Sequence, residues 1–189
     1  MTVVKPPDLG DLVRTYGSPK AAVQHLIESG YTPEEIEWKT GLPYYLIRLF
    51  MEGFQPKSRV PFLKIAKFYD RLALLRGKKG KETELARFFQ RTELSLEVKV
   101  RLALGKIRDE RLGVGEGIVK KAICIAAGTS IQRVSELLVN YGEYGEVAYL
   151  LTTPKTARLT TEEVYEAIRI IPKIDGVFNR TLHISSLLR

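Results

Sequence analysis

The chain has 189 residues, of which 44% are hydrophobic, so it is long enough and apolar enough to bury a core. Its 30 Lys and Arg side chains outnumber 22 Asp and Glu side chains, and the formal charge of +8 favours a polyanionic partner, nucleic acid before an anionic membrane. No apolar run approaches the roughly 20 residues of a membrane span, no signal-peptide core is present, and the single Cys124 excludes an internal disulfide and a cysteine-based zinc site. We therefore expect a cytoplasmic, nucleoid-associated protein with no membrane association, no metal and no cofactor.

The charge is concentrated in the middle of the sequence. Residues 1–56 carry 5 basic and 7 acidic side chains, residues 57–121 carry 18 and 8, and residues 122–189 carry 7 and 7. The middle segment, with a charge of +10, is expected to hold the contact with a polyanion. The alternative is a set of solvated helix faces or an ion-pair-rich surface of the kind found in a thermophilic archaeon.

Helix start and stop signals recur along the whole chain. In the first part, Ser18 and Thr32 precede prolines as N-caps, Gly41 ends a short helix, and Pro43 begins the next. The polar stretch 55–59 then breaks the pattern, so we expect a domain boundary there, with an N-terminal module over residues 1–56 and a second domain over residues 57–189.

The second domain is also predicted to be helical. A 3.6-residue apolar period covers residues 62–75, a basic loop follows at 77–81, and Ser95 and Ser130 are expected to cap later helices. Further helices are expected around residues 85–89 and 118–128, and over 143–151, 161–171 and 180–188. Because no segment combines a strand period with hairpin turn signals, the predicted fold class is all-α.

Residues 33–52 have the spacing of a helix-turn-helix. Gly41 provides the sharp turn, Leu42 is expected in the core, and Ile47 and Phe50 pin the second helix across the first. This spacing is typical of transcription regulators, in which the second helix lies in the major groove.

The second helix of this unit would present Tyr44, Tyr45 and Arg48 to solvent. However, Glu37 stands where a small residue is usual, and the segment is acidic, unlike most DNA readers. Three interpretations therefore stay open, namely groove reading, docking of a protein partner, and a structural cap. The two tyrosines would fit a core equally well.

Residues 112–122 (LGVGEGIVKKA) form the most chemically specific stretch. Glycines let the backbone turn tightly into a helix and let a phosphate approach closely, while free N–H groups and the helix dipole favour an anion. This is the chemistry of helix-hairpin-helix DNA binding, with an ordinary inter-helix turn as the alternative. The candidate DNA-binding residues of this glycine turn are Arg111, Gly113, Gly115, Gly117, Lys120 and Lys121.

From about residue 60 onward the chain resembles the N-terminal DNA-binding domain of ATP-dependent DNA ligases of the archaeal and eukaryotic type. Four stretches carry the resemblance in the expected order, namely 62–72 (FLKIAKFYDRL), 112–122, 141–148 (YGEYGEVA) and 161–189. The resemblance implies an all-helical domain that binds the minor groove of nicked duplex DNA and contacts phosphates through helix N-termini and loops.

The family joins its two closing helices by a Gly-x-Gly-Ser turn, and this chain has residues 176–183 (GVFNRTLH) at that place. Only the first glycine is retained, while Asn179 could cap the last helix and Arg180 could replace lost charge. These two residues, with Lys78, Lys79 and Lys81 of the basic loop, are the weaker DNA-binding candidates.

The letters Lys-x-Asp-Gly of the ligase adenylation motif occur at residues 173–176, but only 13 residues follow Gly176. We interpret them as an accidental match at a turn that takes Asp-Gly for its backbone needs. No other enzyme motif is found, so the expectation is a non-enzymatic protein that binds duplex, nicked or single-stranded DNA with little sequence specificity, in repair or replication. The alternatives are a sequence-specific regulator, an adaptor that recruits a repair or replication enzyme, and a fragment of a longer ligase.

Overall fold

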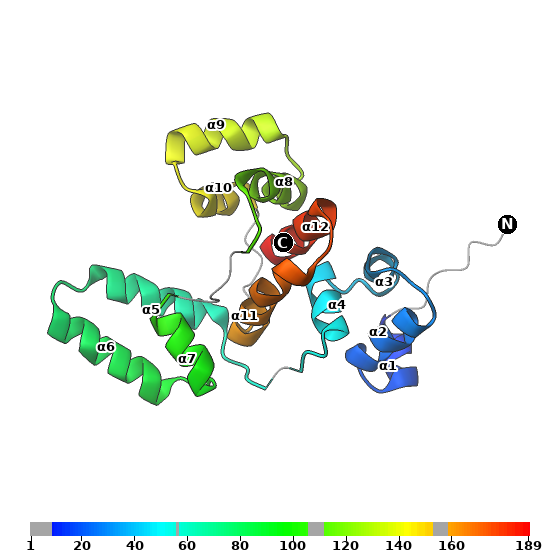
Figure 1. The fold of residues 1–189 in the computed structure, drawn as a ribbon, viewed down its shortest axis with the longest axis horizontal. Coiled ribbons are helices and arrows are strands. Elements are labelled where there is room, and N and C mark those ends of the chain that lie inside the picture. The colour runs from blue at the N-terminus through cyan, green and yellow to red at the C-terminus, as the bar shows by residue number, and fades with distance from the viewer. Residues whose placement is uncertain (1–8, 56, 106–111, 153–158) are drawn as a thin grey trace. The chain divides into compact units, whose positions relative to one another are not determined.

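The computed structural model describes residues 9–55, 57–105, 112–152 and 159–189, and within these ranges the fold is all-α, as expected (Figure 1). The only β-type pairing among the described residues is an isolated bridge between Pro61 and Thr160. No single helix in this part of the chain is long and apolar enough to cross a membrane; one pair, joined at a 112° bend, meets the criterion only when its two helices are counted together.

The chain divides into two compact units whose segments alternate along the sequence. Unit 1 consists of Met1–Gln55, Val114–Thr153 and Ile174–Arg189, and unit 2 consists of Pro56–Gly113 and Pro154–Lys173. The first division lies beside the boundary expected at residues 56 and 57. The rest differs from that expectation, because two later segments pack with the N-terminal helices instead of forming one continuous second domain.

Unit 1 begins with four short helices, α1 (Leu9–Tyr16), α2 (Pro19–Glu28), α3 (Pro33–Thr40) and α4 (Tyr44–Met51). Ser18 Oγ accepts a hydrogen bond from the backbone N–H of Ala21, and Thr32 and Glu35 form a capping box at the start of α3. Gly41 ends α3 with a φ of 68°, which glycine adopts without steric cost. These helices enclose a cluster of buried residues to which Leu42 and Phe50 add, namely Leu12, Ala22, Val23, Leu26, Ile36 and Ile47.

The other helices of unit 1 are α8 (Glu116–Ala127), α9 (Ile131–Tyr141), α10 (Tyr144–Leu151) and α12 (Val177–Leu188). Their buried cluster contains Ile123, Val134, Val147 and Ala148, with Leu188 packed against it. Helix α12 contacts both α8 and α4, so the C-terminal helix joins the two helical groups of this unit.

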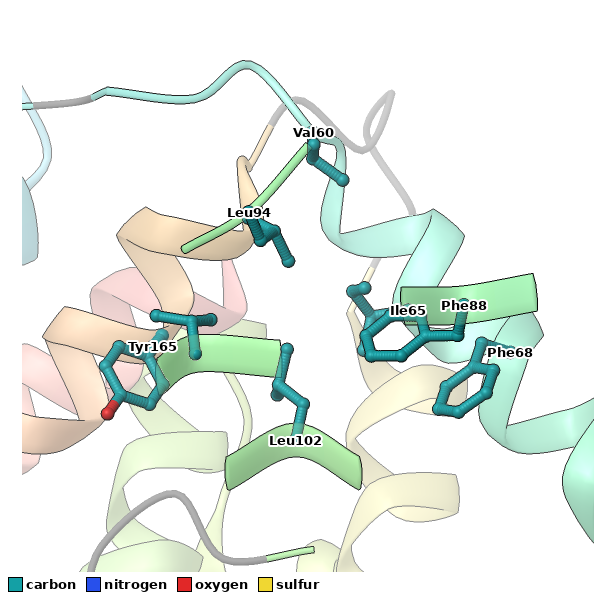
Figure 2. Packing of buried hydrophobic residues seen from close by; sticks show 8 residues of the cluster. Val60, Ile65, Phe68, Phe88, Leu94, Leu102 and Tyr165 are labelled. Atoms are coloured by element: carbon teal, nitrogen blue, oxygen red, sulfur yellow. The ribbon is translucent and has the colours of Figure 1, made fainter. Parts of the chain in front are cut away.

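Unit 2 contains α5 (Phe62–Leu74), α6 (Lys78–Arg91), α7 (Leu96–Ala103), α11 (Thr161–Ile170) and the short 3-10 helix η1 (Ile171–Lys173). Figure 2 shows its core, in which Phe68 of α5 stacks on Phe88 of α6 with ring centroids 4.2 Å apart. Tyr165 of α11 belongs to the same cluster, which accounts for the return of residues 159–173 to this unit.

Hydrogen bonds hold the start of α11 against the segment that precedes α5. The N–H of Thr161 donates to Val60 O at 2.7 Å, and the Glu162 carboxylate accepts from the N–H groups of Lys57 and Ser58 at 2.7 and 2.8 Å. The chain entering α5 is therefore paired with the chain entering α11, about a hundred residues later.

Two predicted boundaries were wrong. Residues 78–81 form the first turn of α6, where a basic loop was expected, because Gly77 alone makes the turn with a φ of 101° and Gly80 is accepted within the helix. Helix α12 begins at Val177, three residues before the expected start. Its N-cap is Gly176, so Asn179 lies inside the helix and does not cap it.

Candidate nucleic-acid interface

The excess positive charge of the chain belongs to unit 2. The segments of unit 2 carry 20 basic and 10 acidic side chains, a formal charge of +10, whereas those of unit 1 carry 10 and 12, a charge of −2. A polyanion is therefore attracted mainly by unit 2.

The start of α6 concentrates this charge. Lys78, Lys79 and Lys81 are all exposed in its first turn, and no acidic residue stands in that turn to offset them. No side chain caps the helix, whose N-terminal N–H groups carry a partial positive charge of their own. Lys78 lies 3.7 Å from the exposed Glu82, a contact of small energetic weight in water.

Helix α5 adds cations that the sequence patterns did not single out. Lys64 and Lys67 are exposed and three residues apart, so they share one helix face. Neither makes a salt bridge within the described part of unit 2, and the same holds for Arg76, which follows the helix. The alternation of these lysines with the buried Ile65 and Phe68 was the available signal.

Other basic residues of unit 2 serve the fold. Arg71 Nε lies 2.6 Å from Glu84 Oε1, and Arg87 Nη1 lies 3.8 Å from the other oxygen of the same carboxylate. Glu84 is buried, so the two arginines compensate a charge that would otherwise be costly inside the unit.

The predicted glycine turn leads into α8. Gly113 has a φ of 64°, which favours glycine, and Gly115 is the N-cap of α8 with a φ of −87° that any residue adopts. Gly117 lies in the first turn of the helix. Arg111, also predicted for this site, lies outside the described residues.

Neither Gly115 nor Gly117 is required by internal packing. A Cβ at either position would meet no atom within 4 Å, and both residues are exposed. A glycine inside a helix costs roughly 0.5–1 kcal/mol relative to alanine, so Gly117 gives up stability while it leaves the backbone without a side chain at that position.

Charged neighbours of the turn act in opposite senses. Lys120 is half-buried and Lys121 is exposed on α8, and both add positive potential. Glu116 in the first turn has a negative charge that would repel a phosphate. Partial burial raises the pKa of the Tyr144 hydroxyl, and so do its hydrogen bond to Glu116 and the charge of that carboxylate.

The closing turn at residues 174–180 is held by its own contacts. Gly176 has a φ of 80°, which favours glycine, so backbone geometry alone suffices to account for the Asp-Gly letters at residues 175 and 176. Arg180 Nε donates to the carbonyl of Ile174 at 2.8 Å, so this arginine stabilises the turn. Asn179 is half-buried in the first turn of α12.

The expected recognition face of α4 is not exposed, and that prediction was wrong. Tyr44 is 1% exposed and Tyr45 is 6% exposed. The backbone N–H of Tyr45 donates to Ser186 Oγ of α12 at 2.9 Å, and Arg48 is half-buried with its guanidinium 5.7 Å from the centre of the Tyr44 ring. The C-terminal helix packs against α4, an arrangement that the spacing of residues 33–52 does not reveal.

The burial of Tyr44 changes its acidity. Desolvation raises the pKa of its hydroxyl to about 12, with Glu34 adding to the rise and Arg48 opposing it. The hydroxyl lies 3.4 Å from Glu34 Oε1 and stays protonated over the physiological range. This ring therefore packs in the interior of unit 1, as in the alternative that placed the two tyrosines in a core.

Comparisons of the sequence with known proteins identify a family and several relatives. Residues 61–188 match the family described as DNA ligase N terminus. The DNA ligase of Nanoarchaeum equitans is 30% identical over 125 residues, which are 61% of this chain and 22% of that protein. DNA ligase 1 of Methanosarcina acetivorans is 32% identical over 123 residues (62% and 21%), and the DNA ligase of Sulfurisphaera tokodaii is 32% identical over 145 residues (67% and 24%).

These matches correct the expectation that the protein is not an enzyme. The relatives are named DNA ligases, and the chain spans only about a fifth to a quarter of their length. The lack of nucleotide-binding motifs in so short a part of a relative is no argument against an enzyme. The matching region covers more than half of the chain and contains the basic helices and the glycine turn, so the chain belongs to the DNA ligase N terminus family.

Proposed function

We propose that this chain binds duplex DNA through the phosphate backbone, largely independently of base sequence, and so holds DNA for a ligase. The observation that carries the proposal is the charge of +10 on unit 2, much of it on exposed side chains without a salt bridge among the described residues. Phosphate contacts dominate sequence-independent affinity, and they need cations of this kind.

Two helix starts supply the ordered contacts in this proposal. The first turn of α6 combines three lysines with an N-terminus that no side chain caps. The start of α8 offers backbone N–H groups at Gly115 and Gly117 without side chains in front of them, and Lys120 and Lys121 follow on the same helix. Both starts favour an anion and neither distinguishes one base from another.

The burial of Tyr44 and Tyr45 supports sequence-independent binding. A helix-turn-helix reads bases through side chains on its second helix, and α12 covers the start of that helix here. The relatives named DNA ligase join DNA, so we expect intact and nicked duplexes as the preferred forms, and single strands as the weaker one.

The test is a salt titration of binding by fluorescence anisotropy, with matched intact, nicked and single-stranded DNA. Each neutralised duplex phosphate contributes roughly −0.9 to the slope of log affinity against log salt. The triple variant K78A/K79A/K81A is expected to bind duplex more weakly and to flatten the slope by up to about 2.7.

The matched control is R14A/K20A/K39A, which removes three cations from unit 1. It should leave the slope within about half a unit of the parent. No binding to any DNA at low salt, or equal slope changes for the two triple variants, would refute the proposal. Preference for one duplex sequence over random competitor would refute its sequence independence.

A further inference from the structure

Unit 1 contains an apolar pocket next to the cations of α8. It has a volume of about 400 Å³ and lies between the second half of α8, the first residue of α9 and the first turn of α12. Its apolar wall is formed by Cys124, Ile125, Ile131, Val177 and Phe178, and Lys121 is the charged residue that lines it. Ligand sites in this size range commonly combine an apolar wall with a few polar groups.

The apolar side chains at the mouth of the pocket are exposed, and they do not belong to the buried core. Phe178 is 65% exposed and Val177 is 56% exposed, side by side in the first turn of α12. Apolar groups exposed at a concave site mark a surface that meets a partner.

We propose that this pocket receives one unpaired nucleobase of the bound DNA, stacked on Phe178, with a neighbouring phosphate on Lys121. The inference deepens the proposed function, on which it rests, and predicts that a gap, a bulge or a flap adds affinity to duplex binding. Aromatic side chains stack on every base through its π-face, so the pocket would not be sequence-specific.

Charge and position favour DNA over an apolar side chain of another protein. Lys121 lines the pocket, Lys120 precedes it, and no acidic residue of the described chain is among the lining side chains. Lys121 lies six residues from Gly115, about 9 Å along the axis of α8. A strand with a phosphate at the glycine turn therefore reaches the pocket within about three nucleotides at 3.4 Å per step.

The single Trp38, 73% exposed on α3, makes a direct test simple. The variant W38F/F178W carries its only tryptophan at the mouth of the pocket. We expect its fluorescence to be quenched by a duplex with a one-nucleotide bulge or a short gap, and much less by the matched intact duplex. The control W38F/Y149W places the reporter on α10, at a tyrosine that is 71% exposed and does not line the pocket, and should not distinguish the two DNAs.

Affinity provides the second readout. F178A is expected to weaken binding of the bulged duplex about tenfold or more, because it removes the stacking of one base on an aromatic ring. Binding of the intact duplex should be unchanged. K121A should weaken the bulged duplex more than K39A, which removes the same charge elsewhere in unit 1.

Three outcomes would overturn the inference, namely equal quenching by both DNAs, equal loss of affinity for both DNAs in F178A, and no loss for either. The last would show that no base stacks on Phe178. The proposed function fails separately, because its failure appears as no salt-dependent binding of intact duplex by the unaltered chain.

Discussion

The two units of this chain are both helical, but they differ in net charge and in the groups that their helices bury. Unit 2 is a helical core with a charge of +10, and it exposes lysines on α5 and α6 to solvent. Unit 1 has a charge of −2, and its helices, drawn from three separate segments, bury polar and aromatic groups against one another. In this family member, the excess positive charge thus lies in unit 2, and the burial of the tyrosine pair lies in unit 1.

The largest effect is expected from the core of unit 2. Replacing Phe68 by alanine removes a ring that is almost fully buried and stacked on Phe88, which should cost about 3–5 kcal/mol of unfolding free energy. Chemical denaturation followed by circular dichroism measures the loss, and anisotropy should show weaker duplex binding in parallel. The exposed L74A on the same helix is the control, and a similar cost there would contradict this account of the core.

Alkaline pH should destabilise unit 1 through Tyr44. The pKa of Tyr44 is raised to about 12, so its neutral form stabilises the folded state fully below the unfolded value near 10. The unfolded chain releases this proton first as the pH rises from 10 to 12, and about 2 kcal/mol is lost across that window.

The comparison with variants isolates Tyr44 from other groups that titrate there. Urea unfolding at several pH values should show that Y44F lacks this part of the decline, whereas Y149F, at an exposed position, retains it. Identical pH profiles for the parent and Y44F would rule out this role of the buried hydroxyl.

The junction of α12 with α4 is expected to give an effect of similar size. Ser186 Oγ accepts from the N–H of Tyr45 and donates to the carbonyl of His183 at 2.8 Å, and all three groups lie in buried surroundings. S186A leaves the Tyr45 N–H without this acceptor and should lower unfolding free energy by about 1–3 kcal/mol. Salt-dependent duplex binding should persist once the variant is folded, and a lost salt slope would show that the units are not separable in this way.

The smallest effect is expected at Gly117, where one substitution should raise stability and lower DNA affinity. G117A adds a methyl group that meets no atom within 4 Å in a helical turn, so it should stabilise the chain by about 0.5–1 kcal/mol. The same methyl group stands where a phosphate would approach the backbone and should weaken duplex binding. Thermal denaturation and anisotropy on one sample test both, and a variant that gains stability without losing affinity would remove Gly117 from the site.

Much of the fold was accessible from local chemistry. The caps at Ser18, Thr32, Ser95 and Ser130 form as their sequences predict, because a cap depends on atoms three residues away. The left-handed turn at Gly41 follows for the same reason. The charge of the lysines at 78–81 was visible in the sequence. Two nearby glycines are compatible both with a loop and with a helix that contains Gly80, so the local sequence did not predict the helix.

By itself the sequence determined the all-α class, the family resemblance, the excess of positive charge and the glycine turn before α8, since these depend on composition and short-range spacing. Tertiary structure alone decided which helices share a unit, that Tyr44 and Tyr45 are core residues, and that Phe178 and Ile131 line one pocket. The physical reason is that burial depends on partners distant in the chain. The contact between Tyr45 and Ser186 joins residues 141 positions apart, and no local pattern on α4 specifies the helix that covers it.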